Sequence, residues 1–358
     1  MRLETPVLKN YLLQLFMWKK IPKPIFCLAP MAGITDSAFR LVCKKCGADI
    51  VYSEMASATA LFFKPQKTLE LIQFSPEERP YVVQLFGKEP EHFGEATRLI
   101  SQGVPLIEYG NKKRYKKNKL QPPDGIDINF GCPAKKVFGH GSGAALMEKP
   151  ELAKEIIEAV TSNTEIPVSL KIRSELKTPQ GTFPLLDFLK KIEINSLGIS
   201  TIMVHGRSYG QGFKGPIDYK TIQDVKKYFQ GIVIANGGIK DLESAKIMLA
   251  KTKADGIGVA TGAYGNPLIF NQLKELKQAP AKNKKLWTKK NKTDLASKHA
   301  RYVYKLKGKR GILELRKHFL WYFKGMPNIK KLHPKIVSIN TLNDVKEIIK
   351  DVDKLYKT

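Results

Sequence analysis

Short apolar stretches rich in β-branched residues alternate along the chain with longer stretches in which apolar residues recur every three or four positions. The short stretches predict β-strands and the longer ones predict amphipathic helices. Eight strands are expected, at 25–30, 48–55, 81–87, 125–131, 167–173, 201–207, 232–238 and 256–262. Helices are expected between them, at 36–46, 91–102, 150–162, 184–197, 219–229 and 241–251. Segment 59–74 is ambiguous, whereas Asp36 and Asp241 have the place of helix N-caps.

This regular alternation is typical of an α/β fold with a parallel sheet. An open, doubly wound sheet is the alternative, but eight repeats of near-equal length favour a closed (β/α)8 TIM barrel over residues 25–270. Residues 1–24 form an N-terminal segment ahead of this barrel. Residues 105–123 are interpreted as an insertion before the fourth strand. The N-terminal end of a barrel strand is far from the usual catalytic end, which argues against a direct catalytic role for the insertion.

The pattern changes after residue 270, where no strand signal remains. A Lys-rich linker at 281–292 leads into helical stretches at 295–307, 311–323 and 342–356, so residues 271–358 are expected to form an all-α domain. Within the second stretch, an apolar and aromatic face is interpreted as helix-bundle core rather than as a base-stacking platform. Its members are Leu313, Leu315, His318, Phe319, Tyr322 and Phe323. Arg316, Lys317 and Lys324 lie on the other faces and are candidates for phosphate contacts.

The charge of the chain favours a polyanionic partner. The formal net charge is +28, and residues 271–358 alone carry 24 Lys and Arg against 7 Asp and Glu. A second cluster places six basic residues within 112–119. Nucleic acid is the polyanion that such a distribution suggests, although charge runs are also common on plain solvated surfaces.

Cysteines and apolar runs place the chain in a reducing compartment. Four cysteines (Cys27, Cys43, Cys46 and Cys132) are too few and too scattered for a disulfide framework. Cys43 and Cys46 have metal-like spacing, but they lack a second pair and fall within a predicted helix, so no metal site is expected. The apolar run 11–18 is far shorter than the ~20 residues that cross a bilayer. We therefore expect a cytoplasmic protein with no membrane contact.

In a TIM barrel, functional side chains lie where the strands end. Polar or glycine residues occupy these places here, at 30–33, 53–55, 84–87, 129–132, 171–173, 205–207, 236–238 and 260–262. No two carboxylates converge as in a glycoside hydrolase, and His205 has no partner at metal-ligand spacing. The glycines after the seventh and eighth strands suit a phosphate, because such barrels bind phosphate there through backbone N–H groups.

Cys132 stands in a Gly-Cys-Pro turn directly after the fourth strand, ahead of Lys135 and Lys136. A thiol beside positive charge at a barrel mouth is a candidate acid or nucleophile, although a lone cysteine is also a common small core residue. Lys171 is suited to a Schiff base or to holding an anion. Gln84 and Asn129 are suited to the edge of a planar heterocycle. Together with the phosphate site, these residues suggest bound flavin mononucleotide (FMN).

Several motifs occur together in one order: APMAGITD at 29–36, DINFGCPAKKV at 127–137, SLKIR at 169–173, VHGR at 204–207, IANGG at 234–238 and RKHFLWY at 316–322. In these motifs the chain resembles the tRNA-dihydrouridine synthases, from about residue 24 to about residue 323. The resemblance implies an FMN-bearing barrel with a helical tRNA-binding domain. It further implies that NADPH reduces the flavin, which then passes a hydride to C6 of a uridine in tRNA.

The resemblance also implies roles for individual residues. Cys132 matches the family's acid and would protonate C5 of the uracil. Asn129 and Arg173 are expected to contact the uracil. The cofactor would be held by Pro30, Met31, Ala32, Gln84, Lys171, His205, Asn236, Gly237, Gly238, Ala260 and Thr261. A monomer is expected.

The chain departs from the family pattern in places. Ala260 and Thr261 stand where the family commonly has Gly-Arg, so an arginine contact to the phosphate is missing there. The loop after Cys132 has fewer basic residues and more glycine. Two other functions stay open: an FMN barrel enzyme acting on a free pyrimidine, and a catalytically weak tRNA-binding protein. The basic C-terminal segment speaks against the first, and the presence of Cys132 against the second.

Overall fold

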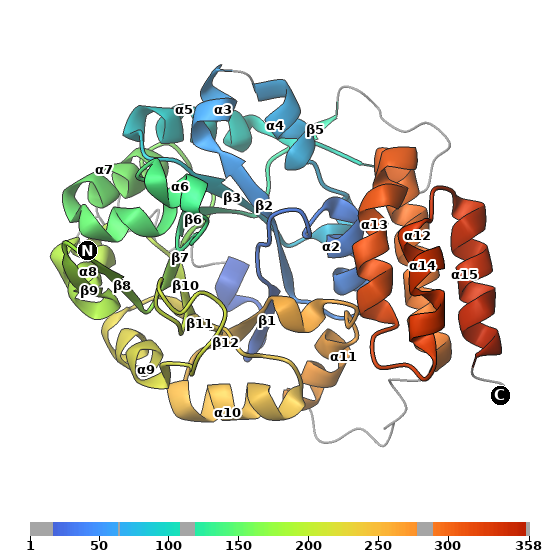
Figure 1. Ribbon diagram of the computed structural model, residues 1–358. Helices are drawn as coiled ribbons and strands as arrows, with labels where there is room; N and C mark the ends of the chain where they lie inside the picture. Colours follow the sequence, from blue (N-terminus) through green and yellow to red (C-terminus); the bar gives the residue numbers. More distant parts are fainter. Residues whose placement is uncertain (1–16, 64, 108–118, 278–288, 356–358) are drawn as a thin grey trace.

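The computed structural model describes residues 17–63, 65–107, 119–277 and 289–355. All eight predicted strands form, and they close a barrel of parallel strands with helices around it, which confirms the (β/α)8 architecture (Figure 1). In chain order the barrel strands are β1 (Ile25–Leu28), β2 (Ile50–Ser57), β3 (Tyr81–Phe86), β6 (Gly125–Phe130), β7 (Val168–Arg173), β10 (Thr201–His205), β11 (Ile232–Asn236) and β12 (Gly256–Val259). Pairing of β1 with β12 closes the ring.

Two hydrophobic layers hold the barrel together. One lies inside the N-terminal half, where Ile25, Ile50 and Ile232 from the starts of three strands pack with Trp18, which is 1% exposed. The other lies between the strands and the surrounding helices. Because strand residues alternate between two layers that are both apolar, the strands read as short continuous apolar runs, such as IFCL in β1 and IVIAN in β11. The C-terminal half of the interior is left to polar residues.

The predicted barrel helices are confirmed as α2 (Ser37–Lys45), α5 (Pro90–Gln102), α7 (Pro150–Thr161), α8 (Leu185–Lys191), α9 (Tyr219–Tyr228) and α10 (Leu242–Thr252). Both predicted N-caps form, since Asp36 accepts from the Phe39 N–H at 2.9 Å and Asp241 from the Ser244 N–H at 2.8 Å. The ambiguous segment 59–74 contains α3 (Ala58–Phe63) and α4 (Pro65–Leu71). The helix expected at 184–197 is shorter, because Glu193 adopts a left-handed conformation (φ 54°) after α8.

Two short antiparallel hairpins have no counterpart among the predicted elements. One pairs β4 (Val104–Pro105) with β5 (Leu120–Gln121), and the other pairs β8 (Glu175–Thr178) with β9 (Gly181–Pro184). The first hairpin brackets the predicted insertion, whose residues 108–118 lie outside the described part of the chain. Residues 281–288 of the predicted linker lie outside it as well.

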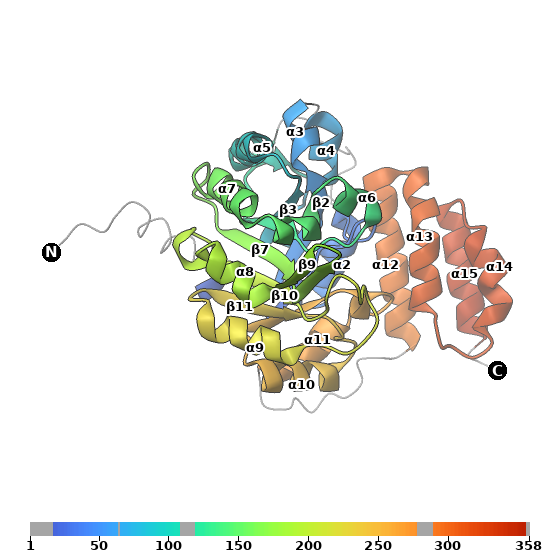
Figure 2. The same cartoon turned by 60° about the vertical axis from the view of Figure 1, so that its left-hand side comes forward.

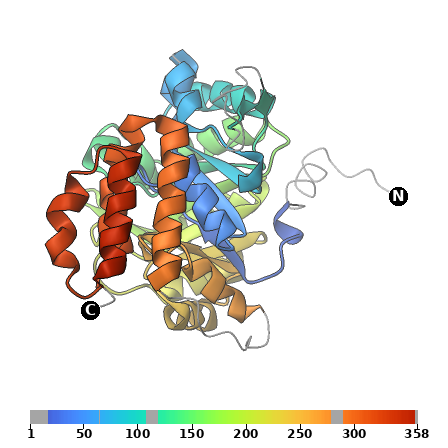
Figure 3. The same cartoon turned by 90° about the vertical axis from the view of Figure 1, so that its right-hand side faces the viewer.

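The C-terminal helices lie together on one flank of the barrel, on the side opposite α7 and α8 (Figures 1 and 2). They are α12 (Lys289–Lys307), α13 (Lys309–Tyr322), α14 (His333–Val337) and α15 (Leu342–Lys354), which we call the helical unit. The predicted aromatic face of α13 is core: Leu315, Phe319 and Tyr322 are buried, and only Leu313 is exposed. The core of the helical unit continues into Ala38 and Leu41 of α2, which lies beside α12 (Figure 3). No helix in the described ranges is long and apolar enough to cross a membrane.

Candidate active site

Cys132 lies just past the end of β6, on a turn that the side chain of Asn129 holds in place. The side-chain oxygen of Asn129 accepts the backbone N–H groups of Gly131 (3.0 Å) and Cys132 (2.9 Å). Gly143 packs behind the turn, where an added Cβ would be 3.1 Å from the Cβ of Cys132. Cys132 is half-exposed, whereas Cys27, Cys43 and Cys46 are buried. The accessible thiol is therefore the one at the barrel mouth.

Two polar layers cross the barrel interior below this turn. The strand register aligns Gln84, Asp127 and Ser169 in one layer, and Asn129 and Lys171 in the next. Hydrogen bonds link the layers: Asn129 donates to Gln84 Oε1 (3.0 Å), and Gln84 Nε2 donates to Asp127 Oδ2 (2.7 Å). Ser169 donates to the other oxygen of Asp127 at 2.5 Å. The sequence analysis missed Asp127, although it occupies the same inward-facing side of β6 as Asn129.

Burial and neighbouring charges shift the pKa values of the titratable side chains in this polar interior. Burial raises the pKa of Asp127 to about 7, against the hydrogen bonds from Ser169 and Gln84 and the charge of Lys171. Burial and the charge of Arg173 lower the pKa of Lys171 to about 8. Burial, together with the cations Lys171, Arg173 and Arg207, lowers the pKa of His205 to about 2. At neutral pH the imidazole is therefore uncharged among positive neighbours, an arrangement that suits an anionic ligand.

His205 and the glycines after β11 form a cradle at the opposite side of the mouth. The Nε2 atom of His205 is buried and has no hydrogen-bond partner in the described part of the chain. Gly237 (φ 112°) and Gly238 (φ 70°) have conformations that favour glycine, and a Cβ at Gly237 would lie 2.7 Å from Cδ2 of His205. Within the described ranges, the backbone N–H groups of these two glycines donate no hydrogen bond. The cradle therefore offers free donors without side-chain obstruction.

Arg207 supplies a cation to this cradle. Its Nη2 lies 4.0 Å from the place of a Cβ at Gly238, and its Nε donates to Gly215 O at 3.0 Å. The sequence analysis placed Arg207 at a strand end without giving it a role. Thr261 begins the 3-10 turn η4 (Thr261–Ala263) after the neighbouring strand β12, at the position where the family pattern has an arginine and this chain does not. Arg207 therefore provides positive charge beside Gly238 of the cradle.

The loop after β1 carries Pro30, Met31 and Ala32 and is fixed from several sides. The Met31 N–H donates to Thr35 Oγ1 (3.1 Å), and the Gly33 N–H donates to the carboxylate of Glu54. From the helical unit, Lys317 donates to Gly33 O at 2.6 Å. This lysine, a candidate for phosphate contact, is thus bonded to the barrel loop.

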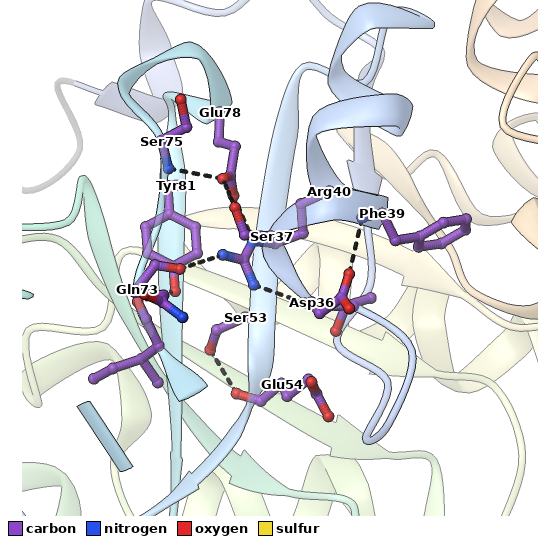
Figure 4. A network of polar contacts seen from close by, with 12 residues as sticks. Asp36, Ser37, Phe39, Arg40, Ser53, Glu54, Gln73, Ser75, Glu78 and Tyr81 are labelled. Carbon is purple, nitrogen blue, oxygen red and sulfur yellow. Dashed lines mark hydrogen bonds and ion pairs between the residues drawn. The ribbon is translucent and has the colours of Figure 1, made fainter. Parts of the chain in front are cut away.

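Below the same loop, the buried Arg40 donates to Thr35 O, Gln73 O and Glu78, at 2.7, 2.6 and 2.6 Å (Figure 4). The backbone at 30–36 is therefore rigidly placed at the mouth.

Arg173, expected at the uracil, is 2% exposed and bonds three backbone carbonyls. Its Nε donates to Gly131 O (2.8 Å), and its Nη1 donates to the carbonyls of Ser208 and Gly212 (3.0 Å each). Stacking of Phe138 on Tyr209, with ring centroids 4.4 Å apart, joins the same two loops. Arg173 therefore ties the cysteine turn to the loop after β10, and its contact with a uracil stays a prediction.

The remaining predicted site residues lie at neighbouring strand ends. Asn236 donates to Gly258 O at 2.7 Å, and Ala260 follows β12, which pairs with β1 below Pro30. Hydrogen bonds join Asn129 to Gln84 and to the Cys132 turn, and the ring of His205 packs close to Gly237. Across the described ranges, no group of three or more His, Cys, Asp or Glu side chains has the geometry to hold a metal ion.

Comparison with known proteins gives consistent matches over most of the chain. The family described as "Dihydrouridine synthase (Dus)" matches residues 27–108 and 115–356. The "Probable tRNA-dihydrouridine synthase" of Rickettsia conorii is 33% identical over 337 residues, which cover 92% of each chain. The "tRNA-dihydrouridine synthase B" of Xanthomonas axonopodis is 36% identical over 70% of this chain and 69% of its own. The "Probable tRNA-dihydrouridine synthase 1" of Synechocystis is 29% identical over 90% and 84%.

Proposed function

The chain belongs to the dihydrouridine synthase family and is an oxidoreductase, and on that premise we propose that it reduces uridine in tRNA to 5,6-dihydrouridine, with FMN as cofactor and NADPH as electron donor. The observation that carries the proposal is the position of Cys132. It is the half-exposed thiol of the chain, and it stands at the barrel mouth near the cations Lys171 and Arg173. A proton donor in this place fits the reduction of a carbon–carbon double bond.

The residues at the mouth fit FMN. Its phosphate needs donors without obstruction, and the free N–H groups of Gly237 and Gly238 beside Arg207 offer them. The unpaired Nε2 of His205 offers one further polar contact. The residues that would hold the group are Pro30, Met31, Ala32, Gln84, Lys171, His205, Asn236, Gly237, Gly238, Ala260 and Thr261. When bound, FMN would supply the hydride, taken from NADPH, for C6 of the base.

Cys132 would give its thiol proton to C5 of the uracil. The sulfur becomes negative as the proton leaves, and the charges of Lys171 and Arg173 favour that state. Arg173 keeps its charge, since its pKa is lowered by burial only to about 10. Lys171, with a pKa of about 8, is mostly protonated at neutral pH. An ammonium suits anion binding better than attack on a carbonyl, so the Schiff-base alternative is disfavoured.

The helical unit supports tRNA as the substrate. A uridine in a folded RNA must leave its stack to reach the barrel mouth, which costs a few kcal/mol and calls for extensive backbone contacts elsewhere. The helical unit flanks the loop after β1 and exposes basic residues there and beyond, among them Arg310, Lys324 and Lys330. An enzyme for a free pyrimidine has no use for this basic flank. The unit therefore favours the tRNA reductase over the free-base alternative.

The test is a visible absorption spectrum of the purified protein, recorded anaerobically. We expect flavin bands that bleach with NADPH and recover on addition of unmodified tRNA. Recovery with free uracil or another small pyrimidine, but not with tRNA, would replace the proposal by the free-base enzyme. A protein that takes up no FMN yet binds tRNA would replace it by the binding protein.

A further inference from the structure

A chain of hydrogen bonds runs from the backbone of the cysteine turn to a carboxylate buried in the barrel. It begins at the N–H groups of Gly131 and Cys132, passes through the side-chain amides of Asn129 and Gln84, and ends at Asp127. Gln84 is 1% exposed and Asp127 is fully buried. Asp127 has no direct role in the chemistry described above, which raises the question of what it contributes.

The direction of every bond in this chain is fixed by its two ends. A backbone N–H only donates, so the atom of Asn129 that faces Cys132 must be its oxygen, and its NH2 group must face Gln84. Gln84 then accepts with its oxygen and directs its own NH2 group toward Asp127. Because the pKa of Asp127 is about 7, the group is partly protonated at neutral pH, but in either form one of its oxygens accepts from Gln84 and completes the chain. Reversal of either amide would place donor against donor.

Burying the Asp127 carboxyl group in this layer of the barrel costs folding free energy. Removing a charge from water costs several kcal/mol, and Asp127 forms no salt bridge within the described ranges. Its compensating contacts come from Ser169 and Gln84, with Lys171 acting at longer range. An apolar residue would pack there at lower cost. The presence of an acid here is explained by a role that an apolar side chain lacks, and the directed amide chain provides one.

We propose that Asp127 is a positioning residue for Cys132, which acts through Gln84 and Asn129 to hold both amides in the one orientation that fixes the cysteine turn. Only the role of Cys132 as acid rests on the proposed function. The mechanical part of the inference concerns residues present in the chain and needs neither flavin nor tRNA.

The experiment measures alkylation of Cys132 by iodoacetamide in the purified full-length protein, followed by peptide mass spectrometry. Cys27, Cys43 and Cys46 are buried, so their labelling reports unfolding in the same sample. In Asp127→Ala, the NH2 group of Gln84 loses its acceptor, so the Gln84 side chain can turn away from Asn129, and Asn129 then holds the turn less firmly. We expect Cys132 to label about fivefold or more faster, the scale of one buried hydrogen bond, with the other cysteines still protected.

Three further variants separate positioning from general loosening of the core. Asp127→Asn keeps an acceptor for Gln84 and should label within about twofold of the wild type. Ser169→Ala removes the other bond to Asp127 but leaves the amide chain, and serves as the matched control. Asn129→Ala cuts the chain at the turn, so adding Asp127→Ala to it should have no further effect, as in a double-mutant cycle between coupled residues.

Wild-type labelling in folded Asp127→Ala would overturn the inference, and so would equal acceleration in Ser169→Ala or full additivity in the double variant. If Asp127→Ala does not fold, Asn129→Ala and the Asp127→Asn rescue decide the matter by the same readout. In the flavin-loaded enzyme, Asp127→Ala should slow reoxidation by tRNA more than it slows reduction by NADPH. Labelling that behaves as expected in a protein without flavin would refute the proposed function and leave the positioning role intact.

Discussion

At the scale of single residues, exposure separates Cys132 from the other cysteines. Burial raises the pKa of the Cys27 and Cys43 thiols well above the ordinary value, and that of Cys46 to about 12. Such thiols neither exchange protons with water nor meet a substrate. Cys132 is half-exposed and stands on a turn fixed by Asn129, so it is the thiol that a substrate at the barrel mouth can reach.

Replacing Cys132 by alanine should separate the two halves of the proposed reaction. In Cys132→Ala the cradle for the cofactor is untouched, so flavin content and reduction by NADPH are expected to match the wild type. The base loses its proton donor, and the yield of dihydrouridine in tRNA should fall by about 100-fold, the scale of general acid catalysis. Nucleoside analysis by mass spectrometry measures this yield. An unchanged yield would remove Cys132 from the role of acid.

Gly237 is the residue on which the cradle depends most. Gly237→Ala introduces a Cβ 2.7 Å from the His205 ring on a backbone with φ 112°. We expect FMN affinity to fall about tenfold or more, because the backbone strain costs about 1–3 kcal/mol and the displaced ring narrows the cradle. Flavin fluorescence titration of the apoprotein measures it. Gly210→Ala, with open space around the added Cβ, is the control that should bind normally.

A residue of the candidate site could be predicted from the sequence where it lies at the end of a recognisable strand. Gly-Cys-Pro after an apolar strand marks Cys132, and paired glycines mark the cradle. Asp127 was not predictable in this way, because a single acid inside a strand has no local signature, and its partners come from two other strands. Arg207 was missed for a similar reason: only the fold brings it to Gly238.

At the scale of elements, the start of α2 depends on a buried ion pair. Arg40 and Glu78 are both fully buried and 2.6 Å apart, and they join α2 to the 3-10 turn η1 (Pro76–Glu78) (Figure 4). Arg40 also lies over the ring of Tyr81, 4.7 Å from its centroid. The pair thus locks the β1–α2 loop onto the connection between β2 and β3.

Breaking this pair should be costly. Arg40→Met leaves the Glu78 carboxylate buried without a cation, so we expect a loss of about 3–5 kcal/mol in the free energy of unfolding. Urea denaturation followed by circular dichroism measures it. Glu77→Gln removes the neighbouring pair with Lys45, whose side chains are 56% and 47% exposed, and should cost less than about 1 kcal/mol. Equal losses in the two variants would contradict the importance of burial.

Elements with a strong apolar period were predicted, and elements without one were not. The barrel strands stand out as short apolar runs because one side faces the interior and the other faces helices, so both sides are buried. The β8–β9 hairpin does not: of β8 only Leu176 is buried, and the rest of its residues are polar. The early end of α8 depends on the left-handed backbone conformation of Glu193, which the residue type alone does not predict.

At the scale of the whole molecule, buried histidines link stability to pH where the helical unit meets the barrel. His299 and His318 pack against Phe39 of α2, and Tyr322 bonds His299 at 3.3 Å. Burial lowers the pKa of His299 to about 4, despite the nearby Asp36, and it also lowers the pKa of His318 well below the ordinary value. Both rings are therefore neutral in the folded protein at pH values where the unfolded chain already binds a proton.

Acidification should therefore weaken the fold. Below pH 6.5 the unfolded state takes up a proton at His299 that the folded state refuses until about pH 4, so stability is lost across that window and not further below it. We expect about 2 kcal/mol for this residue between pH 7 and pH 5. Thermal melting at both values measures the loss. His299→Gln cannot titrate and should flatten the slope, and an unchanged slope would exclude His299 as its source.

The shared core between α2 and the helical unit bears on how the protein can be recombined. Ala38 and Leu41 belong to the barrel by sequence, yet they pack with Phe319 and Ala300 of the helical unit. A chimera that grafts a relative's C-terminal helices onto this barrel would set foreign side chains against these two residues and against Asp36, which pairs with Lys307. The transplantable module is therefore the helical unit together with α2, two segments separated by most of the barrel sequence, and a chimera should fold stably only when both are exchanged.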